Sequence, residues 1–269
     1  DLKVKANLKI NKGQSLIVTG NVTGDNNKVY YKRDLTAIAD NAEGWHLVAS
    51  PVSGETYDDA YVTAEGIASG SGINRGIASY VTSDDSWAYM QAGSSATFIS
   101  GKGYSVKLAS PGAISFTGTM KVDDTSIALT TSGNGFNLIG NPYPSYINSS
   151  SILTNSTSAL DAQTLWVWNQ STSSYDTRVT VDAFKIAPGQ GFFVKSDGAE
   201  GSVLIAEADQ SHQSTDTFQR TEARPEIYLT LTDGSASREA KIYFIDNKII
   251  GQGAKSFRYF CKELKYDLP

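Results

Sequence analysis

Hydrophobic and polar residues alternate along most of the chain with a period of two. The alternation runs in short stretches that are rich in β-branched and aromatic residues and are separated by glycine, proline, asparagine, aspartate and serine. Successive side chains of a β-strand point to opposite faces, so this pattern predicts short strands. Only residues 55–69 and 149–162 have a pattern that suits short helices. The chain is therefore expected to have an all-β fold.

One phrase occurs twice in the chain. "GWHLVASPVSG" begins at Gly44 and "GFNLIGNPYPS" begins at Gly135, 91 residues later. Three further matches follow in the same order, at offsets of 88 or 89: "SYVTSDDSWAYM" with "VWNQSTSSYDTR", "ISGKGYSVK" with "IAPGQGFFVK", and "GAISF" with "GSVLI". Four blocks in one order indicate a duplication of domain size. We expect two tandem copies of a β-sandwich or jelly-roll-like unit with flanking strands.

Each repeated phrase predicts a strand and the turn that ends it. The proline of the first phrase cannot donate to a strand ladder, so the strand must stop there or lie at an edge. The paired glycines of "GKGY" and "GQGF" predict a bulge or a left-handed turn before an aromatic strand. If the copies are equivalent, two pairs of aromatic residues are equivalent and buried: Trp45 with Phe136, and Tyr104 with Phe192.

The repeat sets the expected organisation of the chain. We expect N-terminal strands or a stalk over 1–43, a first copy over 44–134, and a second copy over 135–210. A polar linker and a hairpin follow over 211–247. The last segment, 248–269, loses the strand pattern and carries five Lys or Arg against two acidic residues. A short basic amphipathic helix and an artefact of cloning or reading frame both fit this atypical tail.

Composition and charge exclude several classes of function. The net charge is −5 and the main body has no basic stripe, so nucleic acid is not an expected partner. No run of about 20 apolar residues occurs, so no membrane span is expected. The single cysteine, Cys261, excludes an intrachain disulfide and a cysteine zinc site. The chain opens on polar, alternating residues, as a mature or trimmed form would. Its low charge and many Ser, Thr, Asn and Gly residues are typical of secreted β-rich proteins.

Aromatic residues are the first candidates for a binding site. Trp166 and Trp168 are two positions apart, so they lie on one face of the predicted strand. The spacings of Tyr80 to Trp87 and of Trp168 to Tyr175 predict hairpins whose rings meet across the strands. Exposed planar rings would stack on sugar faces. The alternative is that these rings pack between sheets, because aromatic residues dominate protein cores.

Acidic pairs are the candidates for catalysis or for calcium. A glycoside hydrolase needs two carboxyl groups across a cleft. Adjacent aspartates in turns usually accept hydrogen bonds from their own backbone instead. Asn137 takes the place of His46 in the second copy, which favours a polar residue on a strand surface over a catalytic histidine. The acidic pairs are Asp58 with Asp59, Asp84 with Asp85, and Asp123 with Asp124. The last two pairs are weak calcium candidates, and calcium is the one cofactor that the sequence leaves open.

The repeated phrases together resemble a known class of sequence. "GWHLVASPVSG", "GKGYSVK", "FNLIGNPYPSYIN", "LWVWNQSTSSYDT" and "IAPGQGFFVK" are similar to the β-rich segment of large surface proteins of Bacteroidota that the type IX secretion system exports. "EIYLTLTDGSASREAKIYFIDN" resembles the strand pair that commonly follows. The resemblance covers residues 8–247. It implies a non-catalytic module at the extracellular or outer cell surface, and no particular ligand.

Three functions follow, in order of preference. The first is a non-catalytic secreted or surface-anchored module for adhesion, or a structural spacer. The second is a carbohydrate-binding module attached to a polysaccharide-degrading or adhesive protein. The third is a glycoside hydrolase. The expected partner is a polysaccharide or another cell-surface ligand, and we do not expect an enzyme.

Overall fold

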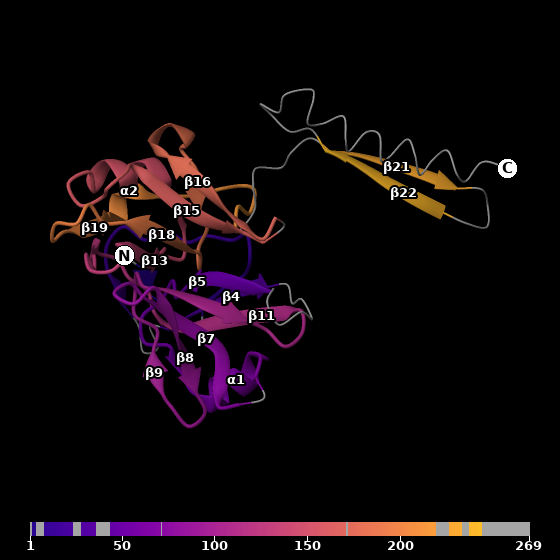
Figure 1. Cartoon of the computed structure of the whole chain (residues 1–269), viewed down its shortest axis with the longest axis horizontal. Helices are drawn as coiled ribbons and strands as arrows, with labels where there is room; N and C mark the ends of the chain where they lie inside the picture. Colours follow the sequence, from indigo (N-terminus) through magenta and orange to yellow (C-terminus); the bar gives the residue numbers. More distant parts are fainter. Residues whose placement is uncertain are drawn as a thin grey trace. The chain divides into compact units, whose positions relative to one another are not determined.

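The computed structural model describes most of the chain. The described residues are 2–3, 8–23, 28–35, 44–70, 72–170, 172–218, 226–232 and 237–243. The chain divides into two compact units, residues 1–220 and residues 221–269. Strands dominate both units (Figure 1), which confirms the all-β fold expected from the alternating pattern. The atypical tail, residues 248–269, lies outside the described residues.

The first half of the larger unit contains two main sheets. β5, β10, β7 and β8 form a four-stranded sheet in that order, and β11, β4 and β2 form a three-stranded sheet. The elements are β1 (Leu2–Lys3), β2 (Leu8–Ile10), β3 (Val22–Thr23), β4 (Lys28–Leu35), β5 (Trp45–Ala49), β6 (Thr56–Tyr57), α1 (Asp59–Ala64), β7 (Asn74–Val81), β8 (Ser86–Gln91), β9 (Ala96–Thr97), β10 (Gly103–Lys107) and β11 (Gly112–Thr119).

The second half has a four-stranded sheet of order β13-β18-β15-β16, with smaller sheets β12-β19 and β17-β14-β20. Its elements are β12 (Thr125–Ala128), β13 (Phe136–Gly140), β14 (Tyr146–Asn148), α2 (Ser149–Asn155), β15 (Thr164–Asn169), β16 (Ser174–Val179), a 3-10 turn (Thr180–Asp182), β17 (Lys185–Ile186), β18 (Gly191–Lys195), β19 (Ser202–Ile205), a second 3-10 turn (Glu207–Asp209) and β20 (Gln210–Ser211). The two predicted helical stretches form α1 and α2.

The two halves share one set of strand pairings. β4 pairs with β11 as β12 pairs with β19, and β5 pairs with β10 as β13 pairs with β18. β7 lies between β10 and β8 as β15 lies between β18 and β16, and β6 pairs with β9 as β14 pairs with β17. Residues 28–119 and 125–205 thus have equivalent topology, starting one strand before the repeated phrase. That they descend from one duplicated unit stays a prediction.

Each half has its own hydrophobic core. In the first half, Val48 of β5, Tyr104 of β10 and Phe116 of β11 are almost fully buried in one cluster. In the second half, Phe192 of β18 and Val203 of β19 are buried in another. Alternate residues of the four-stranded sheets point into these cores, so the residues between them line the opposite face of each sheet.

The last residues of the two helices protect equivalent strand edges. β11 and β19 lie at sheet edges, where backbone N–H groups lack a strand partner. The C-cap residue of α1, Glu65, accepts hydrogen bonds from the N–H and the hydroxyl of Ser115 on β11. The C-cap residue of α2, Ser156, accepts a hydrogen bond from the N–H of Leu204 on β19. Each helix therefore satisfies a donor that would otherwise be open to another strand.

The paired glycines lie where the two four-stranded sheets meet. Gly101 and Gly189 have φ values of 80° and 75°, so both adopt the left-handed conformation that the sequence predicts. A Cβ atom on Gly103 would lie 2.6 Å from Leu138 Cγ. A Cβ atom on Gly191 would lie 3.0 Å from the carbonyl oxygen of Val48. Glycine at these positions lets each sheet approach the other closely.

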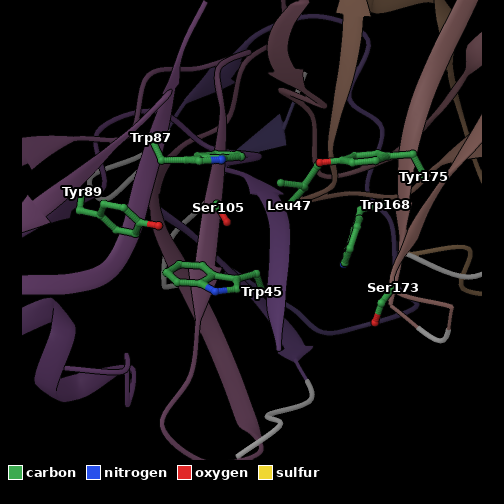
Figure 2. A pocket seen from close by; sticks show the side chains of 8 residues that line it. All are labelled: Trp45, Leu47, Trp87, Tyr89, Ser105, Trp168, Ser173 and Tyr175. Carbon is green, nitrogen blue, oxygen red and sulfur yellow. The ribbon is translucent and has the colours of Figure 1, made fainter. Parts of the chain in front are cut away.

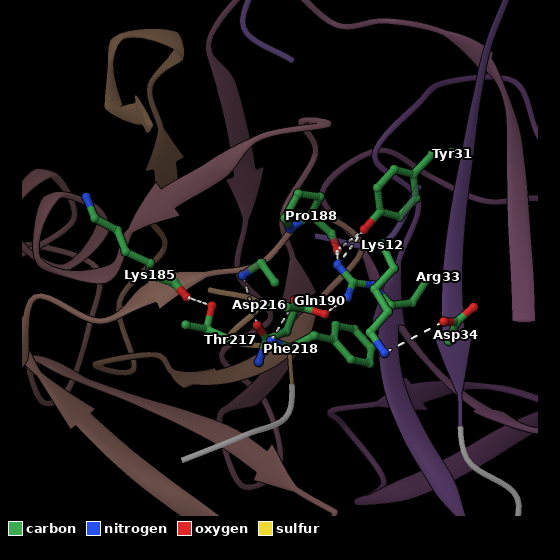
Figure 3. Close-up of polar contacts among 11 residues, drawn as sticks. Lys12, Tyr31, Arg33, Asp34, Lys185, Pro188, Gln190, Asp216, Thr217 and Phe218 are labelled. Atoms are coloured by element: carbon green, nitrogen blue, oxygen red, sulfur yellow. Dashed lines mark hydrogen bonds and ion pairs between the residues drawn. The ribbon is translucent and has the colours of Figure 1, made fainter. Parts of the chain in front are cut away.

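A buried arginine holds the segment that follows the second half. Arg33 of β4 is 1% exposed, and its guanidinium donates to Asp216 and to the carbonyl oxygen of Pro188 (Figure 3). The Phe218 ring lies 4.4 Å from the guanidinium carbon. β20 pairs with β14 in the same region. The predicted linker therefore begins later than its polar composition indicates, because Phe218 and Asp216 attach residues 210–218 to the core.

The smaller unit contains the predicted hairpin. β21 (Glu226–Thr232) pairs with β22 (Ser237–Tyr243) in antiparallel register. The turn around Asp233 and Gly234 lies outside the described residues. The alternating pattern on both sides of that dipeptide was sufficient to predict the pair.

Candidate functional site

Aromatic residues gather on the faces of the two four-stranded sheets that point away from the two cores. We call this the aromatic surface. It contains all four tryptophans of the chain and the five aromatic residues that the sequence singles out. Its members are Trp45, Tyr80, Trp87, Tyr89, Phe136, Trp166, Trp168, Tyr175 and Phe193. The structure thus brings the predicted residues of both halves together at one place.

The predicted hairpin pairs form as the spacing indicates. Tyr80 is directly opposite Trp87 in the ladder of β7 and β8, with ring centroids 5.3 Å apart. Trp168 is directly opposite Tyr175 in the ladder of β15 and β16, with centroids 5.1 Å apart. Phe193 of β18 lies between the hairpins, 5.0 Å from the Tyr80 ring and 5.7 Å from the Tyr175 ring. One buried ring therefore links both sheets.

The rings of the aromatic surface are only partly covered. Tyr175 is 43% exposed and Tyr89 is 40% exposed, while the four tryptophans are half-buried. Trp45 and Phe136 are also half-buried, so the expectation that this pair is buried is wrong. In β5 and β13 the inward positions belong to the neighbouring residues. Tyr104 and Phe192 are fully buried, as expected for their pair.

A first cavity of about 310 Å³ opens in the aromatic surface (Figure 2). Trp45 and Tyr89 come from the first sheet, and Trp168 comes from the second. The hydroxyl-bearing residues Ser105 and Ser173 also line it. The cavity therefore combines flat apolar walls with groups that donate and accept hydrogen bonds.

A second cavity of about 400 Å³ lies beside the first, and both share Trp87 and Tyr175 as lining residues. Its rim carries a polar cluster. The Tyr80 hydroxyl donates to Asp85 and accepts from the side-chain amide of Asn134. Burial, followed by the hydrogen bond to Asp85, raises the pKa of Tyr80. The tyrosine therefore stays protonated at neutral pH and remains a donor.

Sequence reasoning missed Asn134 and the role of Asp85 beside it. Asn134 precedes Gly135 in an Asn-Gly dipeptide, a signal for a turn but not for a binding group. Its partner Tyr80 is 54 residues away and is brought close only by the meeting of the two sheets. Asp85 lies between β7 and β8 at the tip of their hairpin, and its φ is 50°.

Some of the remaining acidic candidates accept hydrogen bonds from backbone N–H groups. Asp58 caps α1 by accepting from the N–H of Tyr61, and Asp124 accepts from the N–H of Glu207. Asp84 and Asp123 are exposed. No group of three or more His, Cys, Asp or Glu residues close enough to hold a metal ion occurs among the described residues. These positions thus match turn and cap residues.

The other features that bear on catalysis are also placed. His46 is 3% exposed and Asn137 is 7% exposed, so the expectation of a strand-surface position is wrong. Both side chains lie on the inward face of their strand, because they alternate with Trp45 and Phe136. Among the described residues, Asp85 is the only carboxylic acid that lines either of the two cavities. Hydrolysis by the two-carboxylate route requires a second one.

Comparison with protein-family models, with curated proteins and with solved structures finds no match. Among the described residues, no helix has the length and apolar character needed to cross a membrane.

Proposed function

We propose that this chain is a non-catalytic module that binds carbohydrate through the aromatic surface. One observation carries the proposal: half-buried tryptophan residues from two sheets line adjacent cavities that also hold polar groups. A sugar ring has apolar faces and hydroxyl groups at its edge. Aromatic rings can cover the faces, while a few placed polar groups fix the orientation.

The polar groups match the needs of a hydroxyl-rich ligand. Ser105 and Ser173 offer hydroxyls in the first cavity, and each hydroxyl can donate and accept. Asp85 and Asn134 offer a carboxylate and an amide in the second cavity. A ligand with many hydroxyl groups can form hydrogen bonds with all of these polar groups. An apolar ligand would displace water from them and form no hydrogen bond in its place.

The setting follows from the resemblance and from composition, and it is part of the proposal. The low charge, the duplicated β-rich phrases and the resemblance to exported surface proteins of Bacteroidota support an extracellular or outer-surface location. Binding of a polysaccharide there would serve adhesion, or would hold an attached catalytic domain close to its substrate.

A structural spacer is the second candidate, and a specific observation favours it. The rings of the aromatic surface also contact one another edge to face, as Phe136 and Trp166 do at 5.1 Å. Such contacts contribute about 0.5–1.5 kcal/mol each beyond the area they bury. If these contacts are the only function of the rings, the rings join the two sheets and bind no ligand.

A glycan-array screen of the full chain, with and without calcium, tests the proposal. The variants are Trp168→Ala for the first cavity and Trp166→Ala for the second. The matched control is Val181→Ala, because Val181 is 88% exposed and lies outside both cavities. Thermal unfolding of every variant separates loss of binding from loss of fold.

Binding that a folded tryptophan variant loses and the Val181 variant keeps supports the carbohydrate-binding module. Absence of binding to every glycan, together with a lower Tm for both tryptophan variants, contradicts it and supports the spacer. A signal that depends on calcium would direct attention to Asp84 and Asp123 as candidate ligands.

A further inference from the structure

The two cavities are built from equivalent positions of the two halves. Trp45 and Phe136 are 91 residues apart, and each begins the first strand of its sheet. Four further pairs of lining positions correspond at an offset of 88 residues: Tyr80 with Trp168, Asp85 with Ser173, Trp87 with Tyr175, and Ser105 with Phe193. The remaining lining residues belong to one cavity alone: Leu47, Tyr89, Asn134 and Trp166. At these five pairs of positions, a residue of one half lines one cavity and its equivalent in the other half lines the other cavity.

The backbone supports this equivalence. Asp85 and Ser173 are hairpin-tip residues with nearly equal positive φ values of 50° and 48°. The contacts between the sheets are reciprocal: the N–H of Ala49 donates to the carbonyl of Gly189, and that of Gly140 donates to the carbonyl of Gly101. Reciprocal contacts of this kind define a two-fold relation between two bodies. The two-fold relation exchanges Trp87 with Tyr175, and both of these residues line both cavities.

We propose that the two cavities are adjacent subsites for one oligosaccharide of at least two sugar units, which crosses between Trp87 and Tyr175. The inference rests on the proposed function, because it assumes that the ligand is a glycan. Volumes of about 310 and 400 Å³ lie at the lower end of the range for small-molecule pockets, so each cavity suits one ring and its neighbouring groups.

The differences between the cavities set the direction of the bound chain. A two-fold axis reverses the direction of any chain that lies across it, so identical halves would bind a glycan equally in both orientations. Among the equivalent lining positions, two exchange a polar group for an unlike one: Ser105 faces the first cavity where Phe193 faces the second, and Ser173 takes the place of Asp85. The second cavity thus has a carboxylate, and the first has hydroxyls. A glycan has unlike ends, so one orientation is preferred.

The test measures affinity against ligand length. Isothermal titration uses the full chain with ladders of one to six units of β-1,4-glucan, β-1,4-xylan and α-1,6-mannan. Joining two rings makes the second contact intramolecular, so we expect the oligomers to bind at least ten-fold more tightly than the single sugar. We expect one oligomer per chain.

Two variants separate the subsites. Asp85→Asn keeps the shape and tolerates the positive φ, and it should weaken oligomer binding about ten-fold, because a hydrogen bond to a charged group is lost. Asp84→Asn is the matched control, since Asp84 is in the same hairpin tip but lines neither cavity. Trp45→Leu should remove the dependence of affinity on ligand length, because Trp45 lines only the first cavity.

The outcomes distinguish this inference from the proposed function. Absence of binding by every ladder overturns both. Equal affinity from one unit to six, or two oligomers bound per chain, overturns the two-subsite inference and leaves carbohydrate binding standing. Equal effects of the Asp84 and Asp85 variants would remove the second subsite from the argument.

Discussion

Gly140 and Ala49 occupy equivalent positions of the two halves and meet where the four-stranded sheets approach each other. A Cβ atom on Gly140 would lie 2.2 Å from the Cβ atom of Ala49 and 3.0 Å from the carbonyl oxygen of Gln190. Carbon atoms in contact are normally about 3.5–4.0 Å apart. Both Cβ atoms are fixed by their backbone, so Gly140→Ala should force the sheets apart at a cost of about 2–3 kcal/mol. For a unit of this size that lowers the Tm by about 4–12 °C.

Because the two positions are equivalent, a second substitution at Ala49 should restore part of the stability that Gly140→Ala loses. Ala49→Gly alone should cost about 1–2 kcal/mol, from the lost methyl group and the greater freedom of the unfolded glycine. In the double variant Ala49→Gly/Gly140→Ala, one methyl group enters the same space from the opposite sheet. The double variant should therefore be more stable than Gly140→Ala, although it carries one further substitution. Urea unfolding followed by tryptophan fluorescence gives the four free energies of the cycle.

Gly72→Ala is the control for the glycine substitution itself. A Cβ atom on Gly72 meets nothing within 4 Å, and its φ is not in the left-handed region, so stability should change by less than about 0.5 kcal/mol. The reasoning is refuted if Gly140→Ala behaves like this control. It is also refuted if the double variant loses the sum of the two single losses, because the two positions then share no space.

Three further predictions concern the buried polar groups. Asp216→Ala leaves the Arg33 guanidinium buried without its acid and should cost about 3–5 kcal/mol in urea unfolding; a cost under 1 kcal/mol contradicts the role of this pair. Glu65→Ala leaves the N–H of Ser115 unsatisfied and should cost about 1–3 kcal/mol by the same measurement. Burial raises the pKa of Tyr104 to about 12, so the folded form keeps a proton that the unfolded form loses near pH 10. Its contribution to stability is full below pH 10 and is lost as the pH rises towards 12, and Tyr104→Phe should reduce the slope of that part of a Tm–pH profile without removing it, because other tyrosines have raised pKa values too.

The strands were predictable because their signal is local. Alternation of apolar and polar residues identified β5, β10, β13 and β18, and the proline after each repeated phrase marked where a strand ends. The partners of these strands were less accessible, since pairing of β4 with β11 joins segments about 80 residues apart. Neither segment contains a local signal that identifies its strand partner. The hydrogen bond that the Glu65 carboxylate accepts from β11 could not be predicted for the same reason, because it also joins distant segments of the chain.

The face on which each aromatic residue lies could not be read from the period alone. In "GWHLVAS" both alternating sets contain apolar residues, so the pattern does not say which set faces the core. The structure turns His46 and Val48 inward and leaves Trp45 on the aromatic surface. Burial of a polar histidine in place of a tryptophan runs against the usual ranking of residues, and the sequence alone would not predict it.

The aromatic surface exists only where the two halves meet. The predicted hairpin pairs Tyr80–Trp87 and Trp168–Tyr175 are each local, but Phe193 joins them because the junction glycines let the sheets come together. Either half alone would expose the outer face of its sheet, with large apolar rings that single domains rarely leave uncovered. The meeting of the two halves therefore partly covers these rings and creates the two cavities at the same place. A binding site at this junction is formed by both halves together. Substitutions of the junction glycines should therefore alter it, as substitutions of the tryptophans should.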